Sequence, residues 1–377
     1  MMRIIVVGGG ILGMLTAREL CHSKCQVTLI ERGKLGQESS WAGGGILSPL
    51  YPWRYPDSIT TLASWSQTKY PDLCVSLRHA TGIDPEITNN GMLVIAEDEQ
   101  TLAADWAHRN QRQMSLISQA EMTELEPALA KPALSAIWLP NVGQVRNPHL
   151  AQALAVDIVQ CGVTVLSNTS VTDLMFSNGN VHGIHTERGP QVADAVVICA
   201  GAWTADLLRR YMPAPSIRPV RGQMLLFKTE PGVIRRIVLE ENRYVIPRRD
   251  GHVLFGSTLE ETGFDKSTTE TARNELYALA TERFPILRNY PLVKQWAGLR
   301  PGSPGGIPYI TAHPSFKGLY INSGHFRNGV VLGPASARLM ANIVTGTLPI
   351  VPYEPYSLGA FREGNTDHLD LPGDRCL

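Results

Sequence analysis

The chain has 377 residues, more than one hydrophobic core usually holds, so two domains are expected. Lys and Arg together number 34, as do Asp and Glu, and this balance leaves no net field to attract nucleic acid or an anionic membrane. Six scattered cysteines lack the spacing of a zinc site or a C-x-x-C pair, and no apolar stretch is long enough for a membrane span. We therefore expect a cytoplasmic protein that holds no metal.

The N-terminus predicts a dinucleotide site. The β-branched run 4–7 predicts a buried strand that ends at the glycine-rich run 8–13, where a helix begins. Gly8 permits the tight turn, Gly10 lets the backbone approach a pyrophosphate, and Gly13 lets helix and strand pack closely.

Two further features belong to the same site. Free N–H groups at the start of the helix, around Ile11 and Leu12, point where a diphosphate would lie. Glu31 ends a second expected strand, 26–30, where it can accept hydrogen bonds from an adenosine ribose, and Arg32 follows it.

The next segment, 36–45, is a loop of small residues. A large flat cofactor needs backbone donors brought close without side-chain obstruction. The loop supplies hydroxyls and bare backbone for this at Ser39, Ser40, Gly44 and Gly45, with Ile46 next in the chain.

Helices and strands then follow in turn. Asp57 or Ser58 is expected to cap a helix that runs to about Arg78. Further helices are expected over 99–111 and 148–160, and strands over 92–96, 163–166, 171–176, 181–186 and 192–199.

From residue 217 to 255 the pattern changes to long alternating strands. Hairpin turns are expected at 230–232 and 250–251, which indicates an antiparallel sheet. A short buried strand at 319–322, a glycine-bounded segment at 324–333 and a helix to about Val344 follow. The sequence predicts an α/β fold with a Rossmann-like parallel sheet and a second α+β domain on a mostly antiparallel sheet.

Three more motifs accompany the N-terminal fingerprint: residues 31–33 with 39–45, Trp296-Ala297-Gly298-Leu299-Arg300-Pro301-Gly302, and Gly324-His325-Phe326-Arg327-Asn328-Gly329. In this order they resemble the D-amino acid oxidase family of FAD-dependent amine oxidoreductases, and within it the glycine oxidase branch. The resemblance spans nearly the whole chain. It implies an FAD-binding domain over 1–87, 145–219 and 298–365, a substrate-binding domain over 88–144 and 220–297, and a loose tail over 366–377.

The resemblance also implies roles for particular residues. A guanidinium offers a planar fork that matches a carboxylate. Arg300 would bind the carboxylate of an amino acid, with Tyr244 adding a hydroxyl. Arg327 is either a second cation for that carboxylate or the partner of a surface acid, and we favour the first. His325 is either an acid/base group or an anchor for its loop, and we favour the anchor.

The start of the C-terminal helix would face the flavin, where its N–H groups and dipole stabilise negative charge on the reduced ring. The FAD contacts implied there and elsewhere are Val171, Gly201, His325, Phe326, Arg327, Asn328, Gly329 and Val330. Ile46, Leu259 and Asn242 depart from the family pattern and put the substrate preference in doubt. The Arg300 motif lacks the cysteine to which related sarcosine oxidases attach flavin, so FAD is expected to be non-covalent.

The implied reaction is oxidative deamination of glycine or a small D- or N-methyl amino acid. A hydride would pass to flavin N5, and oxygen would reoxidise the flavin, giving an oxo acid, ammonium and hydrogen peroxide. By analogy, the product would serve thiamine thiazole formation. Family members are often homotetramers, which implies self-association.

Three alternatives stay open at this point. An amine or D-amino acid dehydrogenase would pass its electrons to a quinone. An RNA-modifying flavoprotein is disfavoured by the balanced charge, and a redox-silent binding module is disfavoured by the presence of Arg300.

Overall fold

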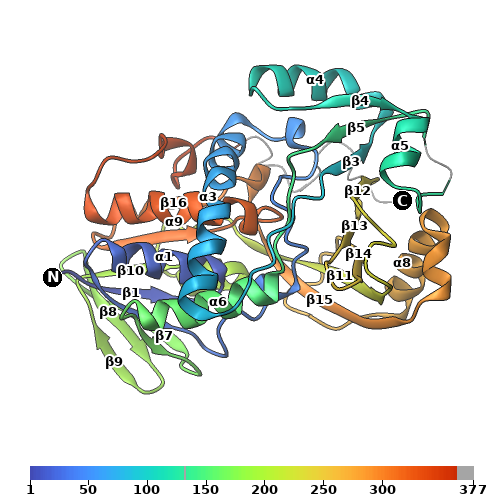
Figure 1. Cartoon of the computed structure of the whole chain (residues 1–377). Helices are drawn as coiled ribbons and strands as arrows, with labels where there is room; N and C mark the ends of the chain where they lie inside the picture. Colours follow the sequence, from blue (N-terminus) through green and yellow to red (C-terminus); the bar gives the residue numbers. More distant parts are fainter. Residues whose placement is uncertain (131–132, 363–377) are drawn as a thin grey trace.

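The computed structural model describes residues 1–130 and 133–362, which form two lobes on separate sheets (Figure 1). The strands of the first lobe's main sheet are β1 (Arg3–Val7), β2 (Gln26–Ile30), β6 (Thr164–Leu166), β10 (Ala195–Ile198), β16 (Tyr309–Ala312) and β17 (Leu319–Ser323). They lie in the order β16-β17-β10-β1-β2-β6, with β16 antiparallel to β17 and the other neighbours parallel. This is the predicted Rossmann-like sheet.

Both faces of this sheet are covered. The helices α1 (Ile11–His22), α3 (Asp57–Thr81), α6 (Asn147–Gln160) and α9 (Gly329–Thr345) pack on one another and share a core with one face. A three-stranded sheet of β7 (Val171–Ser177), β8 (Asn180–Thr186) and β9 (Gly189–Val192) covers the other. Ile4 and Val6 face the helices, whereas Ile5 and Val7 face the small sheet, which explains why β1 is apolar at every position from Ile4 to Val7.

The second lobe has an eight-stranded sheet. Its strands are β3 (Met92–Ile95), β4 (Ser115–Ser118), β5 (Ser135–Leu139), β11 (Arg218–Lys228), β12 (Ile237–Glu240), β13 (Arg243–Pro247), β14 (His252–Gly256) and β15 (Leu292–Gly302). They lie in the order β15-β11-β14-β13-β12-β3-β5-β4, and neighbours are antiparallel except for the parallel pair β12 and β3. The prediction of a mostly antiparallel second sheet is confirmed.

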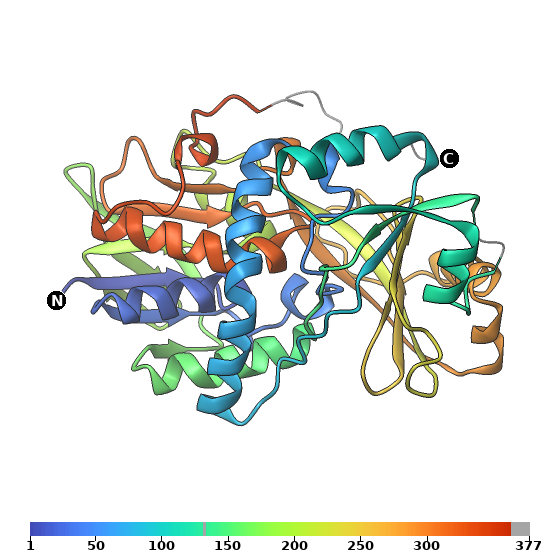
Figure 2. The same cartoon turned by 45° about the horizontal axis from the view of Figure 1, so that its top comes forward.

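Helices also cover one face of this sheet. α8 (Glu270–Arg283) contributes Leu276 and Ala280 to a core with Val245 and Phe255, and α5 (Gln119–Leu125) contributes Met122. α4 (Gln100–Arg109) packs on the opposite face, where Ala103 shares a core with Val94 and Ile137 (Figure 2). Single-turn helices are α2 (Ser39–Ala42) and α7 (Thr204–Leu208), and 3₁₀ turns lie at Pro52–Arg54, Glu97–Glu99, Gly201–Trp203, Pro285–Asn289, Pro304–Gly306 and Glu354–Tyr356.

Two strand predictions were wrong in detail. The run 192–199 is not one strand, because Asp194 accepts a hydrogen bond from the Arg3 N–H (2.8 Å) and the chain passes there from β9 to β10. The turn at 230–232 is not a hairpin, since the sheet neighbours of β11 are β14 and β15. The hairpin at 250–251 is present, and a tight turn at Glu241 and Asn242, both at positive φ, joins β12 to β13.

Helix boundaries also differ from the prediction. α9 begins at Gly329 and contains Gly333, where a Cβ would lie 2.9 Å from Leu15 Cδ1, so this glycine serves close packing of α9 against α1 rather than a loop. The 36–45 loop contains α2, and α3 begins at Asp57 without a side-chain cap. Both α8 and β15 were missed. The expected loose tail, 366–377, lies outside the described residues.

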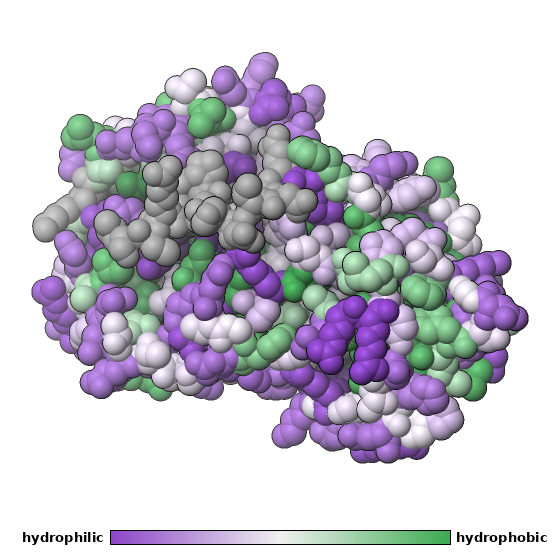
Figure 3. All heavy atoms as spheres, turned by 180° about the vertical axis from the view of Figure 1, so that it is seen from behind, coloured by the Kyte–Doolittle hydropathy of each residue, from purple (hydrophilic) through white to green (hydrophobic). Residues whose placement is uncertain are grey.

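Seen from behind, hydrophilic and hydrophobic residues are interspersed over the visible face (Figure 3). Among the described residues, no helix combines the length and the apolar character that crossing a bilayer requires.

Candidate active site

A cavity of about 630 Å³ lies where the two lobes meet, within the usual size range of small-molecule sites. Its lining comes from the ends of β1 and β10, the α2 loop, the start of α9, and β13 and β15 of the second lobe. The predicted site residues that line it are Gly8, Gly10, Ile11, Leu12, Glu31, Arg32, Ser39, Ser40, Gly44, Gly45, Ile46, Val171, Gly201, Tyr244, Arg300, His325, Phe326, Arg327, Gly329 and Val330.

Gly13 and Asn328 lie outside this lining. A Cβ on Gly13 would be 1.8 Å from the Gly8 carbonyl oxygen, so its role is the close approach of α1 to the turn. Asn328 is 1% exposed and precedes the first residue of α9, and its N–H donates to the His325 carbonyl at 2.8 Å.

The glycine turn is a cradle of bare backbone. Gly8 has φ +106°, and a Cβ there would lie 2.4 Å from the Cys199 carbonyl oxygen. At the start of α1, the Ser40 hydroxyl accepts a hydrogen bond from the Ile11 N–H at 2.9 Å. The expectation that these N–H groups are free therefore needs correction, since Ser40 occupies one of them.

Glu31 is fixed by the backbone around it. Its two carboxylate oxygens accept hydrogen bonds from the N–H groups of Gly9 (2.7 Å) and Gly33 (2.9 Å). Each oxygen has a further lone pair, so the carboxylate can still accept from ribose hydroxyls in the cavity. The Arg32 guanidinium stacks 3.7 Å from the centre of the Trp203 ring, another lining residue.

Arg300 lies on β15, where the bare backbone of Gly222 on the paired strand makes room for its guanidinium: a Cβ there would be 2.2 Å from Nη2. The guanidinium donates to the carbonyls of Thr258 (3.2 Å) and Arg221 (3.3 Å) and to the Ser257 hydroxyl (2.5 Å). These acceptors are neutral, and among the described residues no carboxylate forms an ion pair with Arg300. Burial lowers its pKa, and the nearby cation of Arg327 also acts to lower it, against a raising contribution from Tyr244.

Ser257 joins Arg300 to Tyr244. Its hydroxyl also accepts a hydrogen bond from the Tyr244 hydroxyl at 3.2 Å, and Arg243 donates to its carbonyl at 2.9 Å. The sequence analysis missed Ser257, although a serine directly after a strand that ends in glycine was a usable signal. Tyr244 in turn lies against the glycine loop, since a Cβ on Gly44 would be 3.3 Å from the Tyr244 ring.

The geometry of His325 favours an anchoring role. Its side chain is 2% exposed, and Nε2 lies 2.9 Å from the Ser336 hydroxyl on α9, so it anchors to a side chain rather than to backbone. Burial lowers the pKa of His325 to about 3, so the imidazole is neutral near pH 7.

Two of the three departures from the family pattern are at the cavity. Ile46 and Asn242 line it, and the Asn242 N–H donates to the Tyr51 hydroxyl at 3.3 Å. Leu259 lies outside the lining.

Comparisons with known proteins show the family to which the chain belongs. The family described as FAD dependent oxidoreductase, DAO, matches residues 3–343. The glycine oxidase of Pseudomonas aeruginosa is 45% identical over 94% of this chain and 98% of its own length. The crystal structure of glycine oxidase from Geobacillus kaustophilus superposes with a TM-score of 0.90, at 28% identity, over 98% of this chain and all of that chain.

The fold and the nucleotide cradle define a flavin-dependent oxidoreductase. The chain belongs to the DAO family, and its cofactor is FAD.

The residues present fit that cofactor. Side chains at Gly8, Gly44 or Gly45 would collide with neighbouring atoms, so the bare backbone is needed for the cavity to keep its shape. Glu31 is held rigidly where β2 ends, at the same edge of the sheet as the glycine turn.

The buried neutral imidazole predicts a pH-dependent stability. An unfolded histidine gains its proton near pH 6.5, whereas buried His325 gains it only near pH 3, so the free energy of unfolding falls as the pH is lowered through this window. The slope from this residue approaches about 1.4 kcal/mol per pH unit. Urea unfolding across this range should show a shallower acid dependence for His325→Gln than for the wild type, and parallel curves would contradict the assignment.

Proposed function

We propose that the chain oxidises glycine or a similarly small amino acid to its imine, which water hydrolyses to an oxo acid and ammonium, and that oxygen accepts the electrons and becomes hydrogen peroxide. The observation that carries the proposal is the Arg300 guanidinium, a partly buried cation bonded to neutral oxygens and facing the same cavity as the FAD cradle. Such a cation gains most from an anionic partner, and the carboxylate of an amino acid has the matching shape.

The surroundings of Arg300 favour a small substrate. Tyr244 packs against the Gly44 backbone on one side, and Ile46 and Met224 line the same cavity. The glycine oxidases of Pseudomonas aeruginosa and, at 30% identity, Geobacillus kaustophilus support glycine as the substrate.

In the proposed mechanism the chain's main task is positioning. Arg300 and Tyr244 hold the substrate carboxylate, which takes the place of the Ser257 oxygen as their acceptor, and Arg327 adds a second positive charge at the site. Bound FAD supplies the acceptor for the hydride that leaves the α-carbon. His325 is neutral and bonded to Ser336, so we assign it no proton transfer, and the substrate reacts with its amine already neutral.

A metabolic role follows from the imine that precedes the oxo acid. In this proposal the imine formed from glycine is a precursor for the thiazole of thiamine. The bifunctional ThiO/ThiG protein of Trichormus variabilis supports this part of the proposal, being 29% identical over 90% of this chain, which spans 52% of that protein.

The Arg300→Met variant tests the proposed function. We expect the KM for glycine to rise about a hundredfold or more, because two charge-assisted hydrogen bonds are lost, while the visible spectrum of bound FAD persists. Peroxide release should be measured with glycine, sarcosine, D-alanine, D-proline and L-alanine. Arg338→Met, at a surface ion pair with Glu19, is the matched control. Unchanged glycine kinetics in Arg300→Met would remove Arg300 from the site.

Ser257→Ala tests how the carboxylate site is held. The carboxylate takes over the hydrogen bonds that Ser257 accepts in the free protein, so loss of this hydroxyl removes a competing acceptor, and we expect the KM for glycine to fall by about threefold or more with a smaller change in kcat. Ser257→Thr, which keeps the hydroxyl, should have a KM near that of the wild type. If Ser257 acts through Tyr244, then Ser257→Ala changes the KM for glycine less in a Tyr244→Phe background than in the wild type. Fully additive changes in the two variants would refute this coupling.

A further inference from the structure

Arg248 carries a buried charge from the second lobe into the first. It follows β13, is 7% exposed, and its Nη2 donates to the Gly44 carbonyl at 2.8 Å. Its Nη1 donates to the Val145 carbonyl at 2.9 Å and to the Gln144 side-chain oxygen. Gln144 is itself held, since its amide donates to Asn90 and to the Pro247 carbonyl, each at 2.7 Å.

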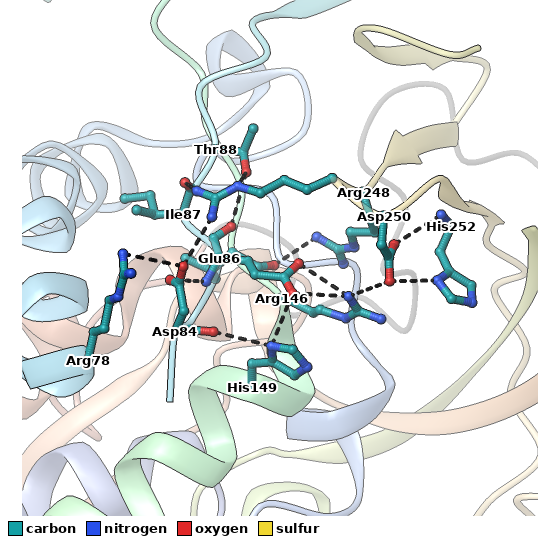
Figure 4. Close-up of polar contacts among 12 residues, drawn as sticks. Arg78, Asp84, Glu86, Ile87, Thr88, Arg146, His149, Arg248, Asp250 and His252 are labelled. Atoms are coloured by element: carbon teal, nitrogen blue, oxygen red, sulfur yellow. Dashed lines mark hydrogen bonds and ion pairs between the residues drawn. The ribbon is translucent and has the colours of Figure 1, made fainter. Parts of the chain in front are cut away.

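The charge of Arg248 is not neutralised by an ion pair. The nearby acids pair with its neighbour instead, because Arg146 lies 3.1 Å from Glu86 and 2.9 Å from Asp250 (Figure 4). Among the described residues no carboxylate pairs with Arg248. Burial lowers the pKa of Arg248 to about 10, with a further lowering from Arg146, and the side chain remains a cation near pH 7. Burying a cation among neutral partners costs free energy of desolvation, which suggests that Arg248 has a role that offsets this cost.

The reason lies in the peptide between Gly44 and Gly45. This peptide is trans, so its carbonyl and its N–H point in opposite directions. Because the Gly44 carbonyl faces Arg248, the Gly45 N–H points away from Arg248. Both glycines line the FAD cavity, and among the described residues the Gly45 N–H donates to no protein oxygen.

The backbone around this peptide cannot easily turn over. The Gly45 carbonyl accepts a hydrogen bond from the Val145 N–H at 2.9 Å, and the φ of Gly45 is +79°. A guanidinium bonded to the carbonyl also polarises the amide, which makes its N–H a stronger donor.

We propose that Arg248 is a positioning residue for the cofactor, which orients and polarises the Gly44–Gly45 peptide so that the Gly45 N–H is presented to FAD. This role rests on the FAD dependence of the family and not on the choice of substrate. It places a positive charge behind the cavity wall, one peptide away from the bound group.

The test compares Arg248→Met with Arg249→Met. Arg249 is the next residue of the same turn, and it bonds Thr88 (3.0 Å) and pairs with Asp84 (3.1 Å) on the exposed side without reaching Gly44. We expect Arg248→Met to raise the dissociation constant of FAD by about tenfold or more, the scale of one lost charge-assisted hydrogen bond. The midpoint potential of the bound flavin should also fall, because a positive charge that favours added electrons is gone. Arg249→Met should match the wild type in both.

Thermal unfolding of the FAD-free proteins separates this role from a purely structural one. The proposal is overturned if folded Arg248→Met binds FAD with wild-type affinity and potential, or if Arg249→Met shows the same losses. Arg248→Lys covers the case in which the methionine variant does not fold. It keeps the charge but cannot bridge Gln144, Val145 and Gly44 together, so its FAD affinity should still fall severalfold, and wild-type affinity in this variant also refutes the proposal.

Discussion

The site depends on one guanidinium held by neutral oxygens. Arg300 donates to two carbonyls and one hydroxyl. These neutral acceptors hold the guanidinium in position and leave its positive charge available to an anion. Gly222 on the paired strand leaves the space that the guanidinium occupies. A carboxylate that enters the cavity therefore meets a cation that is already oriented, so binding costs little side-chain entropy at Arg300.

The two lobes meet at this cavity, and each contributes what the other lacks. The first lobe brings a glycine turn and a rigid acid, Glu31, to the cavity, and we propose that they hold the nucleotide. The second lobe brings Arg300 and Tyr244, with Ser257 directly after β14, and we propose that they bind the substrate. The glycine loop touches both lobes, since Tyr244 packs on Gly44 and Arg248 bonds its carbonyl. In this arrangement the chain binds and orients, and the redox chemistry belongs to FAD.

Local sequence patterns predicted the start of the first lobe well, because strand, glycine turn, helix and acid follow one another within the first 31 residues. The elements of the second lobe were harder to predict. β15 interrupts its alternation at Gly298 and Gly302, and α8 has a weak apolar stripe, so neither was expected. The partners of β11 are distant in sequence, which no local turn signal reveals. Ser257 and Arg248 were missed for the same reason: their importance comes from contacts with residues 43 and 204 positions away, Arg300 and Gly44.

A crystal structure of the FAD-loaded protein with glycolate, which carries a hydroxyl where glycine has its amine, tests the central claim most directly. We predict that the glycolate carboxylate accepts hydrogen bonds from Arg300 and Tyr244 and replaces the Ser257 oxygen as their acceptor. A glycolate bound elsewhere in the cavity, with Arg300 still bonded to Ser257, would contradict the account.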